Sequence, residues 1–172
     1  MKNLKLFVAL SFLFIGSFSL SAQDFGVVDV ESVLSNFGEK KTADTQLDAL
    51  VQKHQAEIKK QQEALLAIEK EVQTKTEGKS QTEIQGMMKE LEGKQQEYMT
   101  KQQALGTYQQ AAAKELGEKE NTLLKPIEDK VKASINKVAA AKGLKYVMEK
   151  SILLYSNGTD ITADVKKDLG IK

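Results

Sequence analysis

The chain has 172 residues, of which 28% are charged and 6% aromatic, and it contains no Cys, no Trp and one Pro. The lack of Cys excludes disulfide scaffolds, thiolate zinc sites and cysteine nucleophiles, and a single His leaves little material for catalysis or metal binding. All 25 basic residues are Lys, so the chain lacks the bidentate recognition of phosphate or guanine that Arg provides.

The first predicted element is a signal peptide over residues 1–22. Lys2 and Lys5 precede an apolar run from Leu6 to Ile15, and a small, polar stretch ends at Ala22. A basic start, a short apolar centre and a small-residue exit are typical of a cleaved secretory signal. The alternative is an uncleaved anchor, but the run is short for a membrane span of about 20 residues. We therefore expect an exported, soluble mature protein.

Removal of the signal changes both charge and apolar content. Lys2 and Lys5 are removed with it, so the mature chain contains 23 Lys and 24 acidic residues. Because its net charge is close to zero, we expect no net electrostatic attraction to nucleic acid. Four of the six Phe also lie in the first 20 residues. The rest of the chain holds too few large apolar groups for an ordinary globule of this size.

A strand near 25–30 is predicted next, followed by a long helical hairpin over 42–117. The hairpin region is rich in Gln, Glu, Lys and Ala, lacks Pro, and carries apolar residues every seven positions, which indicates two helices with coiled-coil seams. The first series comprises Val51, Ile58, Leu65 and Val72, and the second comprises Ile84, Leu91, Tyr98 and Leu105.

The alignment of the two helices is predicted from these series. Pairing Val72 with Ile84, and then each next member of the two series in turn, places apolar residues opposite apolar residues. In every pair, the two residues are equally far from Gly78 in the sequence. The same alignment places polar layers together, with His54 opposite Gln102. Gly78 can end a helix, and Ser80 with Glu83 forms a capping-box sequence. We therefore predict an antiparallel hairpin with its tip near 77–80.

The C-terminal part has a different pattern. Pro126 indicates a kink or a fresh helix start, and strands are predicted near 144–149 and 152–155, before a turn and a short helix that begins near Thr162. The predicted fold class is mainly α with a small β body, formed by 23–41 and 118–172. Three short strands are marginal alone, so we expect association with further copies.

These elements resemble the Skp/OmpH family of periplasmic chaperones. The resemblance rests on FGVVDVESVL at 25–34, on Pro126 to Lys150, and on LLYSNGTDITADVKKDL at 153–169. It implies a jellyfish-like homotrimer whose strands form a shared body and whose helical arms surround a cavity. It also implies ATP-independent holding of unfolded outer-membrane proteins in the periplasm. Peripheral membrane or lipopolysaccharide contact would fit strongly basic relatives better than this near-neutral chain.

Candidate client-binding residues are the apolar side chains of the hairpin that lie off the predicted seam. Without a partner inside the hairpin, they are expected to face the client; the alternative is incidental surface exposure, which is common. These residues are Leu50, Leu66, Met87, Met99 and Tyr108.

Other functions have less support in the sequence. A structural coiled-coil adaptor or spacer of the cell envelope is the main alternative, although the tip at 77–80 lacks the large apolar anchor that interfaces use. No triad, paired carboxylates or metal cluster supports an enzyme, and no cofactor is expected. Gly78-Lys79-Ser80 lacks the preceding Gly and strand of a phosphate-binding loop, and His54 is interpreted as a seam residue, not a ligand or base.

Overall fold

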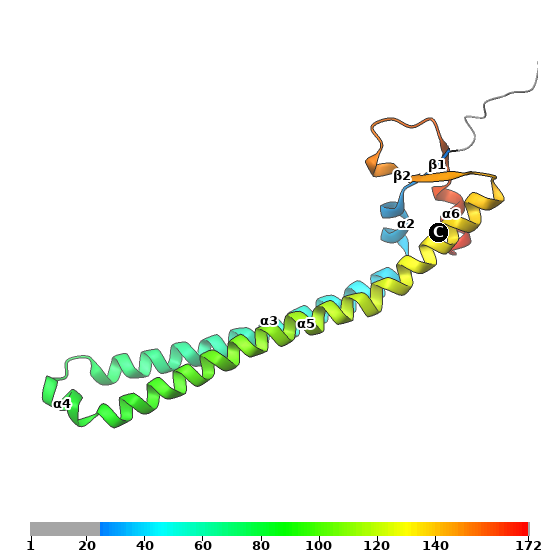
Figure 1. Cartoon of the computed structure of the whole chain (residues 1–172). Helices are drawn as coiled ribbons and strands as arrows, with labels where there is room; N and C mark the ends of the chain where they lie inside the picture. The colour runs from blue at the N-terminus through cyan, green and yellow to red at the C-terminus, as the bar shows by residue number, and fades with distance from the viewer. Residues whose placement is uncertain (1–24, 172) are drawn as a thin grey trace, which may run out of the picture. The chain divides into compact units, whose positions relative to one another are not determined.

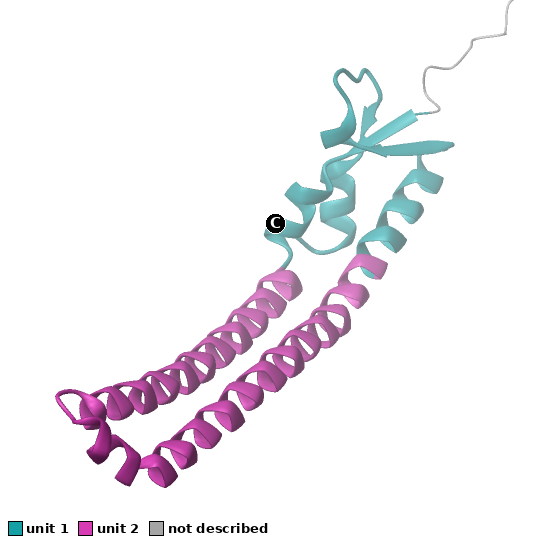
Figure 2. Cartoon of the chain, turned by 60° about the vertical axis from the view of Figure 1, so that its left-hand side comes forward, with its two compact units in different colours: residues 1–37, 130–172 teal, residues 38–129 magenta. Residues whose placement is uncertain are grey.

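The computed structural model describes residues 25–171, so the predicted signal peptide lies outside the described part of the chain. The chain divides into two compact units, one containing the residues up to Phe37 and from Lys130 onward, and the other spanning Gly38–Asp129 (Figure 2). The predicted hairpin, 42–117, falls within the second unit. Among the described residues, no helix has the length and apolar character needed to cross a bilayer.

The first unit contains a three-stranded parallel sheet with the order β2-β1-β3. Strand β1 (Phe25–Val28) is central and pairs Phe25 with Tyr146 of β2 (Tyr146–Glu149) and Gly26 with Thr159 of β3 (Thr159–Asp160). The strand predicted near 25–30 ends at Val28 because Asp29 caps the next helix, its side chain accepting a hydrogen bond from the N–H of Ser32. Segments from both ends of the chain thus form one sheet.

The strand predicted at 152–155 is wrong. Residues Lys150–Ile152 form a short 3-10 helix, and the third strand comes later, at Thr159–Asp160. Leu154 and Tyr155 are instead exposed. Their apolar character resembles that of a buried strand, but the central strand pairs with Thr159–Asp160 at that edge, so the apolar run has no sheet partner within the chain.

Two short helices cover the core of the first unit. Helices α2 (Val30–Asn36) and α6 (Thr162–Asp168) contribute Val33 and Val165, which are fully buried together with Ile161. The core also includes Val131 and Val138 of α5 (Met88–Ala141). These side chains are medium-sized aliphatics, as expected for a chain with so few aromatic residues.

The second unit is the predicted antiparallel hairpin (Figure 1). Helix α3 (Gly38–Thr76) and the first part of α5 lie side by side. Helix α5 continues through Pro126, so the proline neither ends the helix nor starts a new one. The prediction of a long helical hairpin with a small strand-containing unit is confirmed.

The connection between the two long helices is longer than the predicted tip. Gly78 has a φ of 74°, a left-handed conformation that Gly adopts without steric cost, and Ser80 forms the predicted capping box with Glu83. The capped helix, α4 (Gln81–Gly86), is only six residues long. Met87 then interrupts the helix before α5 begins at Met88.

The alignment of α3 against α5 differs from the predicted one by about one heptad. Glu71 pairs with Lys94 and Lys75 with Glu90, so the contacts are centred near residues 82 and 83, not on Gly78. Met88, which the alignment centred on Gly78 would place opposite Ile68, is exposed. The alignment centred on Gly78 is therefore wrong, and α4 occupies the connection.

Candidate functional site

The five candidate client-binding residues differ in exposure. Leu66 is 61% exposed and Met99 is 56% exposed, whereas Leu50, Met87 and Tyr108 are half-buried. Tyr108 also has a polar partner inside the hairpin, because its hydroxyl lies 2.9 Å from Nδ1 of His54. The expectation that all five lack a partner is wrong for Tyr108.

Leu66 and Met99 lie on the same side of the hairpin. Glu71 and Lys94 face each other across the two helices, with 2.7 Å between their charged atoms. Leu66 precedes Glu71 by five residues and Met99 follows Lys94 by five. Leu66 and Met99 each directly follow a seam position, whereas Glu71 and Lys94 each directly precede one. In a pair of antiparallel helices, residues that directly follow seam positions lie on one face and residues that directly precede them lie on the other. The two exposed apolar side chains therefore share one face, away from the Glu71–Lys94 pair.

An open groove lies between α3 and α5 close to the tip. Its volume is about 550 Å³, and its apolar lining comes from Ile68, Val72, Leu91 and Tyr98. Its polar lining includes Glu69, Lys94 and Gln95. The sequence prediction missed this groove because the alignment centred on Gly78 gave Val72 and Leu91 other apolar partners across the seam.

Charged side chains cross the hairpin beside this groove. The Glu71 carboxylate accepts from Lys94 and Lys75, and these hydrogen bonds, that of Lys94 first, lower the pKa of Glu71. On the groove itself, the hydrogen bond to Glu69 raises the pKa of the Tyr98 phenol. Exposed ion pairs stabilise a protein only modestly, so we expect these contacts to add little to the stability of the hairpin.

His54 is buried in the seam and contacts α5. Its side chain is close to Tyr108, with ring centroids 5.7 Å apart in an edge arrangement, and its Nε2 atom lies 3.5 Å from the Glu115 carboxylate. The predicted partner, Gln102, lies one heptad away from the contact that forms. His54 therefore forms a polar layer in an otherwise largely apolar seam.

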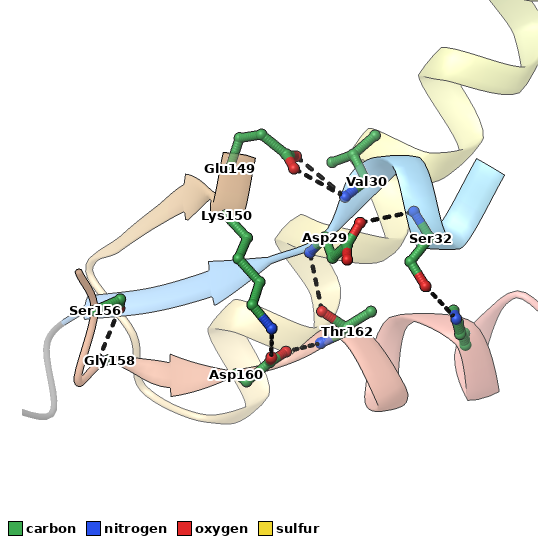
Figure 3. A network of polar contacts seen from close by, with 10 residues as sticks. Asp29, Val30, Ser32, Glu149, Lys150, Ser156, Gly158, Asp160 and Thr162 are labelled. Atoms are coloured by element: carbon green, nitrogen blue, oxygen red, sulfur yellow. Dashed lines mark hydrogen bonds and ion pairs between the residues drawn. The ribbon is translucent and has the colours of Figure 1, made fainter. Parts of the chain in front are cut away.

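In the first unit, polar contacts tie the carboxyl ends of the strands to the helices that follow (Figure 3). The N–H of Asp29 donates to Thr162 Oγ1 at 2.9 Å, and the N–H of Val30 donates to the Glu149 carboxylate at 3.1 Å. Asp160 accepts from the N–H of Thr162, and contacts with Thr162 lower the pKa of Asp160. These contacts hold the unit together.

Apolar side chains are exposed on and after β2. Phe25 and Tyr146 stack with ring centroids 5.1 Å apart, yet both remain substantially exposed. The segment that follows exposes Ile152, Leu154 and Tyr155. Because β2 is an edge strand, this surface combines unpaired backbone groups with apolar side chains.

The hairpin and the small parallel sheet match a known family. The model of outer membrane proteins described as OmpH-like matches residues 24–169. The chain belongs to the OmpH-like family. No curated protein matches the chain significantly.

A solved structure has the same OmpH-like fold. It is a candidate outer membrane chaperone (OmpH-like) from Caulobacter crescentus CB15, with a TM-score of 0.66 and 19% sequence identity. The match covers 90% of this chain and 88% of that chain. At this identity the likeness shows the fold, which agrees with the family found from the sequence.

Proposed function

We propose that this OmpH-like chain is an ATP-independent holdase chaperone. It is exported to the periplasm, binds unfolded outer-membrane proteins between helical arms, and prevents their aggregation before membrane insertion. The observation that carries the proposal is the family match over residues 24–169 together with the helical hairpin. The solved relative described as a candidate outer membrane chaperone supports it.

The surface of the hairpin supports weak, adaptable binding. Leu66 and Met99 present flexible apolar side chains on one face, and a groove of about 550 Å³ opens near the tip. Unbranched, polarisable Met side chains adapt to varied partners, and promiscuous binding uses such surfaces. We propose that Leu66 and Met99 contact clients directly, with Leu50 and Met87 contributing from half-buried positions.

The exposed apolar surface of the first unit supports self-association. An edge strand with exposed apolar neighbours invites pairing with another chain, and a sheet of three short strands gains stability from a larger shared core. We propose that β2 and the segment 150–158 form the contact between subunits, in the homotrimer that the family resemblance implies.

The test is suppression of aggregation. A urea-unfolded outer-membrane β-barrel protein is diluted into buffer as the client. Its aggregation is followed by light scattering, with and without one oligomer of this protein per client molecule. We expect the wild-type protein to keep the client soluble and the Leu66→Ser/Met99→Ser variant to be several-fold less effective. A matched control is Gln62→Ser/Gln103→Ser, which changes two exposed polar residues of the same helices.

Two results would contradict the proposal. Equal protection by the wild-type protein and the Leu66→Ser/Met99→Ser variant would remove the role of that face. No protection by the wild-type protein, combined with binding of a folded envelope protein, would favour the structural adaptor.

A further inference from the structure

The heptad pattern of the hairpin permits two alignments of its helices. An antiparallel seam with a seven-residue repeat brings equivalent positions together again when one helix slides by seven residues. In the alignment centred on Gly78, Val72 would face Ile84; in the structure, Val72 and Leu91 line the same groove. Apolar matching alone does not choose between these alignments, so another interaction must do so.

The polar layer at His54 distinguishes the two alignments. His54 is 4% exposed and its Nδ1 is 2.9 Å from the Tyr108 hydroxyl, whereas its buried Nε2 lies 3.5 Å from the Glu115 carboxylate without forming a hydrogen bond. Sliding by one heptad would move Tyr108 about 10 Å along the seam. In the alignment centred on Gly78, His54 would face Gln102, so the slide would replace the buried contact with the Tyr108 hydroxyl by one with an amide.

The residues between α3 and α5 could supply the extra length of helix that a slide by one heptad would require. Helix α4 (Gln81–Gly86) is separated from α5 by Met87 alone, and the N–H of Met87 still bonds to the Glu83 and Ile84 carbonyls. Small adjustments at this residue would join α4 to α5. The joined helix would add about two turns to the returning arm and shorten the loop to the residues around Gly78.

We propose that His54 and Tyr108 form a register lock that holds the arm in the observed alignment, against a second alignment one heptad away in which α4 becomes part of α5. A single buried polar residue in a coiled-coil seam is known to specify alignment at some cost in stability. Replacing it with Leu should preserve the helices and the stability while allowing both alignments.

Distances between spin labels test the lock directly. Because the chain has no Cys, Leu66→Cys can be combined with Met99→Cys or with Glu92→Cys, one heptad earlier on the same helix face. Labelled protein is diluted with unlabelled protein so that only distances within one subunit are measured. In the observed alignment, we expect the 66–99 distance to be short and the 66–92 distance to be about 10 Å longer in the axial direction.

The lock is then removed by His54→Leu. We expect a second population in which the 66–92 distance shortens and the 66–99 distance lengthens, with unchanged helical circular dichroism. The matched control is Gln61→Leu, since Gln61 is a seam residue whose side-chain hydrogen bond is to Glu57 of its own helix. We expect the control to keep the wild-type distances.

A second variant keeps the proposal testable if His54→Leu does not fold. Tyr108→Phe removes only the hydroxyl that contacts His54 and retains the ring. We expect it to populate the second alignment in part. Wild-type distances in every folded variant of His54 and Tyr108 would overturn the proposal.

Discussion

At the scale of single residues, the sheet depends on a glycine where backbone and side chains approach closely. A Cβ at Gly26 would lie 2.6 Å from Leu144 Cδ1 and 3.4 Å from both the Val147 side chain and the Thr159 carbonyl. Gly26 occupies the central strand, so neighbours on both sides restrict the adjustment. A Cβ at this position would therefore force the Leu144 side chain to move.

We predict that Gly26→Ala destabilises the protein by about 1–2 kcal/mol, as overpacking of a core does. Urea unfolding followed by circular dichroism measures the change. Gly93→Ala is the matched control, because a Cβ there meets nothing within 4 Å and replacing a helical Gly stabilises by up to about 1 kcal/mol. Equal effects of the two substitutions would contradict this prediction.

A second residue-scale feature is the carboxylate of Asp168 on α6. Hydrogen bonds from Lys137, and secondarily from Ser134, lower the pKa of this carboxyl. A lowered pKa in the folded state means that the ionised form is favoured by folding. The stabilisation is therefore present above the ordinary pKa of Asp and is lost as the pH falls through the lowered value.

We predict that Asp168→Asn lowers the urea midpoint at neutral pH and that its difference from wild type disappears in acid. The measurement is urea unfolding of both proteins over a series of pH values. Asp48→Asn, at an exposed position of α3, should show no comparable pH-dependent difference. A difference for Asp168→Asn that grows toward acid pH would refute the assignment.

At the scale of elements, the capping box organises the hairpin connection. Ser80 accepts from the N–H of Glu83, while the Glu83 carboxylate accepts from the N–H of Ser80 and lies 2.7 Å from its hydroxyl. These contacts satisfy N–H groups that the start of α4 would otherwise leave without a partner. They also lower the pKa of Glu83, with the Ser80 side chain as the largest cause.

We predict that Ser80→Ala destabilises α4 by about 1 kcal/mol, the usual effect of losing such a cap. Hydrogen exchange of amides in residues 81–87 should become several-fold faster, while amides in the middle of α3 stay unchanged. Ser80→Thr retains the capping oxygen and should exchange as the wild type does. Faster exchange throughout α3 would show that the effect is not local.

At the scale of the whole molecule, we expect copies of the chain to associate with one another through the first unit. The exposed Leu154 and Tyr155 follow an edge strand of a sheet with only three short strands. We predict that the mature protein has a solution mass of three subunits and that Leu154→Ser/Tyr155→Ser shifts it to smaller species. Multi-angle light scattering measures the mass. Leu66→Ser, on the hairpin, should leave the mass unchanged, and a monomeric wild-type protein would contradict the prediction.

The candidate surface was only partly predictable from the sequence. Leu66 and Met99 were found because apolar residues that depart from a heptad series are expected outside the seam. Tyr108 fits the same rule but contacts His54, since its partner depends on how far the helices slide. The groove lined by Val72 and Leu91 was missed for the same reason.

The sequence by itself determined the long hairpin, the turn at Gly78 with its capping box, and the small sheet built from both chain ends, because periodicity and turn chemistry are local signals. Tertiary structure alone decided the alignment of α3 against α5 and the choice of Thr159–Asp160 over residues 152–155 as the third strand. The reason is physical: a repeat of seven matches itself again after seven residues, and an apolar run forms a strand only where a neighbouring strand is available to pair with it.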